Sequence, residues 1–122
     1  MRGRAAQERN TLRPRLRILH DGEIALGPGK ADLLEAIGSE GTIAGAASGL
    51  GMSYMRAWTL VRTMNRCFRR PLVEARRGGA TRGAASLTRT GHEVLALYRR
   101  MERQSARAVA RGWLALRKSL KG

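Results

Sequence analysis

The spacing of apolar residues predicts a short β-hairpin and then a helix near the start of the chain. From Leu12 apolar and polar residues alternate, as in a strand, and the turn sequence His20-Asp21-Gly22 precedes a second alternating stretch. Gly27-Pro28-Gly29 interrupts this pattern, and Lys30 to Ile37 then has helical spacing. The residues of this first helix that we expect to face a core are Leu33, Leu34 and Ile37.

Two further helices are predicted in close succession. Thr42 is a suitable N-cap for a short helix, and Gly51 stands where such a helix can end in a left-handed residue. Ser53 can then cap the next helix. The apolar residues of the short helix are Ile43, Ala46, Ala47 and Leu50. Two helices joined this tightly must cross steeply, which is typical of a helix-turn-helix.

The second of these two helices has an apolar face and a basic face. Its apolar residues recur at spacings of three and four and are Ala57, Trp58, Val61, Met64 and Phe68. Its opposite face carries Arg56, Thr59, Arg62, Thr63 and Arg66. Arginine can contact guanine edges and phosphates, and threonine can take either role, so this helix is expected to read the major groove of duplex DNA.

A Gly- and Arg-rich hairpin is predicted next. Leu72 to Arg76 has strand character, and Ala84 to Leu87 has it more weakly. The run Arg77 to Gly83 joins them; its glycines allow the positive φ angles of a hairpin tip, and its arginines suit phosphates or a narrow minor groove. The predicted fold is therefore mainly α with a small β-hairpin wing, a winged helix-turn-helix followed by a long C-terminal helix.

The last predicted helix runs from about Arg89 to Leu120, with Thr88 or Thr90 as its N-cap and Gly112 as a candidate interruption. Its apolar stripe comprises Val94, Tyr98, Met101, Ala108, Val109, Trp113, Leu116 and Leu120. Such a helix would be roughly 45 Å long, which is more than one small domain covers. We therefore expect a homodimer through this helix, because paired recognition helices would read half-sites about one DNA turn apart. The expected contact residues are Tyr98, Met101, Val109, Trp113 and Leu116.

These elements divide the chain into a flexible basic arm at residues 1–11, a winged helix-turn-helix at 12–88 and a dimerisation helix at 89–120. Lysine and arginine number 24 against nine acidic residues, a net charge of +15. Nine arginines lie between Ser53 and Thr90, where Glu74 is the one acid. Such a charge favours a polyanionic partner, usually nucleic acid. The sequence has neither a membrane-length apolar run nor the apolar core of a secretory signal, so the cytoplasm is the expected location.

Few residues are candidates for catalysis or metal binding. His20 and His92 lack Cys, Asp or Glu at ligand spacing, which favours turn and helix-surface roles. Cys67 is the single cysteine and is favoured as a buried small hydrophobe over a redox sensor. Trp58 and Trp113 are favoured as core or dimer anchors over base-stacking platforms. A basic row is favoured as a solvated face over a second phosphate-binding surface and consists of Arg99, Arg100, Arg103, Arg107 and Arg111. We expect no enzyme activity, no metal and no cofactor.

Several segments in a fixed order point to a known family. They span roughly residues 12 to 102 and are Ala31 to Ile37, Gly51 to Tyr54, Ala57-Trp58, Met64-Asn65, Leu72 to Glu74, Gly78-Gly79, Leu87-Thr88 with Gly91, and Leu97-Tyr98. With these segments the chain resembles the molybdate-responsive (ModE-type) transcription regulators, whose DNA-binding domain is akin to that of LysR-type regulators. The resemblance implies a winged helix with Ser53, Tyr54 and Arg56 at the start of the recognition helix and Gly78 to Ala84 as the wing. Full-length members continue into oxyanion-binding β domains whereas this chain stops at Gly122, so we expect no oxyanion binding in it.

Three function classes follow from these interpretations. The favoured one is a dimeric, sequence-specific transcription regulator that binds double-stranded DNA. The others are a nonspecific, nucleoid-type DNA-binding protein and an adaptor module that docks a separate sensor through its C-terminal helix. We expect Arg56 to govern specificity and Arg82 to govern affinity. The expected DNA-contacting residues are Thr42, Ser53, Tyr54, Met55, Arg56, Thr59, Arg62, Arg77, Gly78, Gly79 and Arg82.

Overall fold

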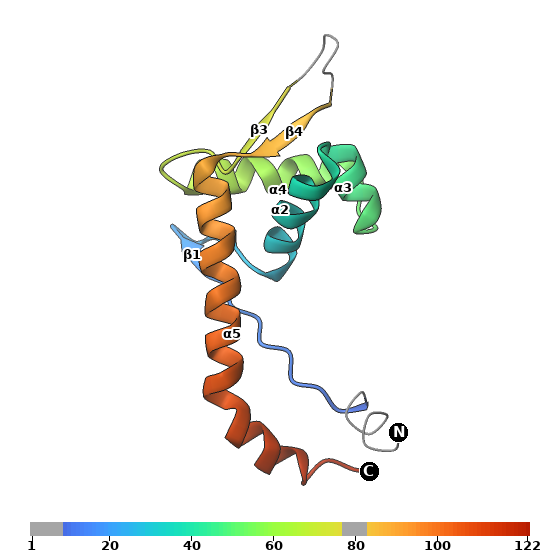
Figure 1. Ribbon diagram of the computed structural model, residues 1–122, viewed down its shortest axis with the longest axis vertical. Helices are drawn as coiled ribbons and strands as arrows, with labels where there is room; N and C mark the ends of the chain where they lie inside the picture. Colours follow the sequence, from blue (N-terminus) through green and yellow to red (C-terminus); the bar gives the residue numbers. More distant parts are fainter. Residues whose placement is uncertain (1–8, 77–82) are drawn as a thin grey trace.

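The computed structural model describes residues 9–76 and 83–122 (Figure 1). In chain order its elements are β1 (Ile18–His20), β2 (Glu23–Leu26), α2 (Pro28–Glu40), α3 (Ile43–Gly49), α4 (Tyr54–Cys67), β3 (Val73–Ala75), β4 (Ala85–Leu87) and α5 (Arg89–Arg117). This is the mainly helical, winged-helix-like fold that the sequence predicts. Most of the predicted basic arm and the wing residues Arg77, Gly78, Gly79 and Arg82 lie outside the described residues.

The predicted N-terminal hairpin is confirmed. Strands β1 and β2 pair antiparallel, with His20 opposite Glu23. Asp21 and Gly22 form the two-residue connection, and both have positive φ angles, 49° and 80°. A turn of this kind matches the right-handed twist of the two strands, and asparagine, aspartate and glycine are the residues that tolerate it.

The first helix is longer than the predicted Lys30 to Ile37, because α2 begins at Pro28 and continues to Glu40. The sequence prediction was wrong at both ends. Proline is well suited to the first turn of a helix, where its fixed φ is already helical and its missing N–H has no partner to lose. The helix ends at Gly41, whose φ of 76° is left-handed.

The caps predicted for the helix-turn-helix are confirmed. The hydroxyl oxygen of Thr42 accepts a hydrogen bond from the backbone N–H of Gly45 at 3.0 Å, and that of Ser53 accepts one from Arg56 N–H at 3.1 Å. Gly51 lies between the helices with a φ of 66°. Leu50, expected on the apolar face of α3, instead caps its C-terminus and is 38% exposed. The predicted tight junction therefore forms, with one fewer core residue.

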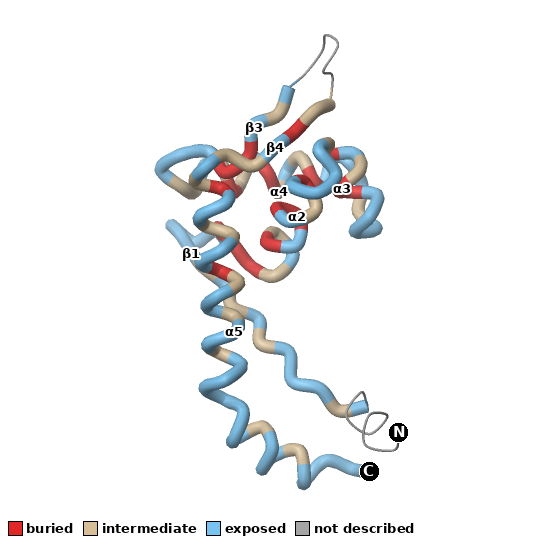
Figure 2. The backbone as a smooth tube through the Cα atoms, in the orientation of Figure 1, coloured by how far each residue is buried: buried red, intermediate tan, exposed pale blue. Residues whose placement is uncertain are grey.

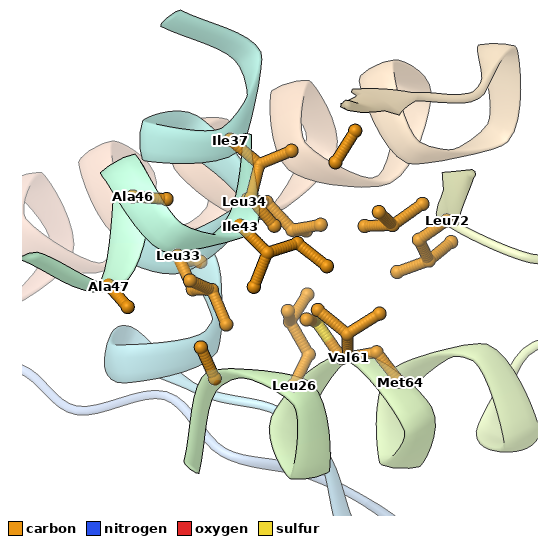
Figure 3. Close-up of a cluster of buried hydrophobic side chains, with 14 of the residues drawn as sticks. Leu26, Leu33, Leu34, Ile37, Ile43, Ala46, Ala47, Val61, Met64 and Leu72 are labelled. Carbon is orange, nitrogen blue, oxygen red and sulfur yellow. The ribbon is translucent and has the colours of Figure 1, made fainter. Parts of the chain in front are cut away.

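A single apolar core lies between α2, α3, α4 and the first half of α5 (Figure 2). Figure 3 shows Leu34 and Ile43 pointing toward Val61 and Met64 of α4. The largest fully buried side chains are Tyr98, Leu26, Leu33, Leu34, Ile37, Ile43, Met64, Leu72 and Val61. Both predicted groups of inward-facing residues, on α2 and on α4, meet here.

The side chain of Asn65 attaches the wing to α4. Its Oδ1 accepts hydrogen bonds from the backbone N–H of Leu72 at 2.8 Å and of Val73 at 3.2 Å, and its Nδ2 donates to the Val73 carbonyl at 3.1 Å. Strands β3 and β4 then pair antiparallel. The base of the wing is held a second time where Ala85 N–H donates to the Gly41 carbonyl at 2.8 Å, just before α3. The base of the wing is therefore fixed to two helices.

Helix α5 starts against the wing. The Thr88 hydroxyl accepts a hydrogen bond from Gly91 N–H at 3.0 Å and donates one to the Pro71 carbonyl at 2.6 Å. Gly91 is buried because it lies directly against the carbonyl oxygen of Leu72, leaving no room for a Cβ. The helix continues through Gly112 without interruption, and its second half extends away from the domain (Figure 1).

Two glycine substitutions in α5 test this packing. Gly91→Ala should lower the free energy of unfolding by about 1 to 3 kcal/mol, because its Cβ would overlap the Leu72 backbone, which cannot move without displacing the wing. Gly112→Ala is the control: a Cβ there meets nothing within 4 Å, so the substitution should stabilise the helix by up to about 1 kcal/mol. Urea unfolding measures both. Equal stability of the Gly91→Ala variant and the wild type would contradict the close approach.

Candidate nucleic-acid interface

The first two turns of α4 present the open surface of the helix-turn-helix. Met55 is 66% exposed and Tyr54 is 46% exposed, and Thr59 and Arg62 are exposed beside them. The rings of Tyr54 and Trp58 pack edge to face with centroids 6.1 Å apart, which gives this surface a rigid aromatic corner. The structure therefore brings together the α4 residues that the sequence proposed for DNA contact.

The two threonine hydroxyls of this helix bond to their own backbone. Thr59 Oγ1 donates to the Met55 carbonyl at 3.0 Å, and Thr63 Oγ1 donates to the Thr59 carbonyl at 3.0 Å. Such bonds leave the methyl group and the oxygen lone pairs for other contacts. Thr59 is therefore equipped to touch a thymine methyl group or to accept a hydrogen bond from a base amino group.

The hydroxyls of Thr42 and Ser53 accept backbone hydrogen bonds as caps, so each retains one hydrogen that can be donated to a phosphate.

Arg56 lies on the flank of α4 and lines a hollow next to the N-terminal hairpin. Arg15, Arg17 and Lys30 line the same hollow, and sequence reasoning did not connect them with Arg56. No local pattern could have done so, because the four residues come from three separate segments.

Arg66, expected on the open basic face, is engaged with the N-terminal hairpin. Its Nη2 lies 2.6 Å from Oε1 of Glu23 on β2. The hydrogen bond from Arg66 holds the pKa of the Glu23 carboxyl below its usual value. Cys67, predicted to be buried, is only half-buried, and its Sγ lies 3.8 Å from the other Glu23 oxygen. This end of α4 therefore anchors the hairpin.

Tyr98 is not available for the predicted dimer contact. Its side chain is fully buried in the core of its own domain, and its hydroxyl donates a hydrogen bond to the Leu16 carbonyl at 2.7 Å. The prediction was wrong for Tyr98 because this residue lies in the part of the apolar stripe that packs on its own domain. Met101, Val109 and Leu116 are 42%, 41% and 58% exposed, and Trp113 is half-buried.

Arg99 is also removed from the predicted basic row. Its guanidinium lies 2.8 Å from Asp32, 3.4 Å from Glu35 and 2.9 Å from Glu102, joining α5 to α2. Burial alone would lower the pKa of Arg99, but the hydrogen bonds to Asp32 and Glu102 raise it above its ordinary value. The other members of the row, Arg100, Arg103, Arg107 and Arg111, are exposed.

Within residues 9–76 and 83–122, no group of three or more His, Cys, Asp or Glu side chains could hold a metal ion. His20 lies 3.3 Å from Asp21 in the hairpin turn, and His92 is exposed on α5. In the same part of the chain, no helix has the length and hydropathy needed to cross a membrane.

The structure thus defines a winged-helix-like domain in which α4, the second helix of the helix-turn-helix, has an exposed and basic face. No family model matches the chain. It is 44% identical over 87 residues to the molybdenum-pterin-binding protein MopA of Rhodobacter capsulatus, an alignment that covers 71% of this chain and 33% of that protein. It is 39% identical over 88 residues to the molybdenum transport protein ModE of Azotobacter vinelandii, with coverage of 72% and 33%. It is 38% identical over 71 residues to the DNA-binding transcriptional dual regulator ModE of Escherichia coli, with coverage of 58% and 27%. The matched part of the chain therefore corresponds to between about a quarter and a third of the length of these relatives.

The Glu23–Arg66 pair makes a testable prediction. In the folded wild type the Glu23 pKa is depressed, so the pair stabilises the fold at neutral pH and this contribution is lost as pH falls through the folded pKa. Replacing Arg66 by Ala should return the Glu23 pKa toward its ordinary value, which NMR titration of the side-chain carboxyl would measure. Arg62→Ala is the control and should leave the Glu23 pKa unchanged. A Glu23 pKa that stays depressed in the Arg66→Ala variant would show that the ion pair is not its cause.

Proposed function

We propose that this chain is the DNA-binding part of a ModE-type transcription regulator and binds double-stranded DNA sequence-specifically in the cytoplasm. The observation that carries the proposal is the open, basic face of α4 in a winged-helix-like domain. The 38% identity to a protein named as a DNA-binding transcriptional regulator supports it. In this proposal the chain is not an enzyme, and its activity is recognition.

The dimensions of α4 suit the major groove. Its 14 residues make a helix roughly 21 Å long, and the diameter of an α-helix with its side chains, about 10 to 12 Å, matches the width of the major groove, about 12 Å. Tyr54, Met55, Thr59 and Arg62 would then face base edges. The wing residues Arg77, Gly78, Gly79 and Arg82 would follow the backbone or the minor groove beside it, with Arg82 contributing affinity rather than specificity.

A homodimer through the far half of α5 completes the proposal. Val109, Trp113 and Leu116 recur at helical spacing along α5. They lie on the same face of the helix as Tyr98, which is buried in the domain nearer the start of α5. Beyond the domain this face remains apolar, and each such side chain gains about 1.5 to 3 kcal/mol on full burial. A second copy of the same helix would cover it by two-fold symmetry and would set the separation of two recognition helices.

A charge substitution on each side of α5 tests the dimer. Leu116→Lys should dissociate it, because the ammonium group would be buried in the contact, and cooperative DNA binding should be lost with it. Leu114→Lys is the control, because Leu114 is 52% exposed but lies on the opposite side of the helix. Sedimentation analysis reads out the assembly. A Leu116→Lys variant that stays dimeric, or equal dissociation of both variants, would place the contact elsewhere.

The net charge of +15 also favours a second candidate, a nonspecific nucleoid-type DNA-binding protein. Both candidates predict strong salt dependence. If six or so phosphates are contacted, the slope of log K against log salt should be about −5. Only a specific regulator should bind some genomic fragments much more tightly than random duplex DNA at physiological salt, which a competition titration would measure.

A flat salt response would contradict both candidates. A steep response with equal affinity for all fragments would support the nonspecific protein instead. The adaptor alternative, in which α5 docks a separate sensor, would be favoured if the chain bound no DNA but co-purified in a defined ratio with one other protein.

A further inference from the structure

A hollow of about 390 Å³ lies between the segment before β1, the start of α2 and the flank of α4. Four of its side chains are cationic: Arg15 and Arg17 precede β1, Lys30 is on α2, and Arg56 is on α4. The remaining lining residues are Ile24, Gly27, Pro28, Gly29, Asp32 and Leu60. The fold therefore gathers positive charge from three separate segments around one concave surface.

This charge is largely uncompensated within the described residues. Asp32 is the acid in the lining, and its Oδ1 already accepts a hydrogen bond from Arg99 at 2.8 Å. Lys30 Nζ donates to the Ile24 carbonyl at 2.7 Å, which is a neutral partner. In the part of the chain that the structure describes, Arg15, Arg17 and Arg56 form no ion pair with a carboxylate.

Two of these cations, Lys30 and Arg56, repel each other. Burial lowers the pKa of Lys30 below its ordinary value, and the charge of Arg56 lowers it further, although Cys67 and Glu23 act in the opposite direction. An anion bound in the hollow would reduce the electrostatic repulsion between these like charges. The planar guanidinium groups of arginine match the oxygens of a phosphate.

We propose that this hollow binds one phosphate group of the DNA backbone beside the major groove entered by α4. The inference rests on the proposed function and deepens it, because it adds Arg15, Arg17 and Lys30 to the interface. It also changes the role of Arg56: on the flank of α4, this residue positions the backbone, whereas Thr59 and Arg62 on the open face remain to read bases. This assignment differs from the sequence-based expectation that Arg56 governs specificity.

The test compares two double variants of equal net charge. In the full chain, Arg15→Ala/Arg17→Ala removes two cations from the hollow, and Arg103→Ala/Arg107→Ala removes two exposed cations from α5. The hollow variant should bind a selected site and random duplex DNA about 10-fold more weakly, by the same factor, and its salt slope should decrease by about 1. The α5 variant should keep its affinity within about twofold. Arg56→Ala should also weaken binding to both DNAs alike. Circular dichroism must show that all variants are folded.

Several outcomes would overturn the inference while leaving the proposed function intact. One is a hollow variant that binds DNA like the wild type, and another is an α5 variant that loses as much affinity, which would indicate diffuse charge only. An Arg56→Ala variant that loses affinity for the selected site alone would show that Arg56 reads bases.

A second arm distinguishes a DNA phosphate from a free anion. Inorganic phosphate is titrated into the wild type and the hollow variant at constant ionic strength, and the amide NMR signals of Gly29 and Lys30 are followed. Saturation in the wild type alone, together with unchanged DNA affinity of the hollow variant, would assign the hollow to a free anion and overturn the DNA source. If the wild type binds no DNA at all, the proposed function fails. If inorganic phosphate then also fails to saturate the amide shifts of Gly29 and Lys30, the hollow is not a phosphate site.

Discussion

The backbone of Leu72 is the point on which the arrangement of the domain depends. Its N–H donates to Asn65 of α4, its carbonyl oxygen accepts a hydrogen bond from Thr88 N–H at 2.9 Å, and the same carbonyl lies against Gly91 of α5. Its side chain is meanwhile fully buried in the core. One residue thus sets the positions of α4, the base of the wing and α5 relative to one another. A shift of any of them would break a buried hydrogen bond or force an overlap.

The positive charge of the surface around α4 depends on which arginines the acidic residues pair with. Asp32, Glu35 and Glu102 all converge on Arg99, and Glu23 is paired with Arg66. These pairs join α5 to α2 and the hairpin to α4, so the carboxylates serve the internal arrangement of the domain. Within the described residues, Arg15 and Arg17 before β1 and Arg56 and Arg62 on α4 remain without such partners, as do the exposed members of the basic row of α5. Because Arg15, Arg17 and Arg56 share one hollow, their arrangement as well as the net charge favours an anionic partner beside α4.

The sequence predicted features whose physical cause is local. Thr42 and Ser53 were predicted as caps, and Thr88 as one of two candidates with Thr90, because a hydroxyl before a helical period satisfies N–H groups within three residues. The hairpin was found for a similar reason. Tyr98, Arg66 and the start of α2 were misjudged because their surroundings depend on the tertiary fold. Tyr98 bonds to a carbonyl 82 positions away, and Arg66 to a carboxylate 43 positions away, and no pattern in a single sequence carries such pairings.

The continuity of α5 through Gly112 has a consequence for symmetry. Glu102, which is clamped by Arg99, and Val109, on the apolar row, are seven residues apart, which is close to two full turns. The face of α5 that packs on the domain and the face proposed to meet a second copy therefore lie on the same side of one continuous helix. In the proposed dimer, seven extra residues in α5 would move the two domains apart with little change of orientation, whereas two extra residues would rotate each domain by about 200° relative to the dimer contact. If α5 forms the proposed dimer contact, the number of residues between these two contacts sets both the distance between the two domains and their relative rotation.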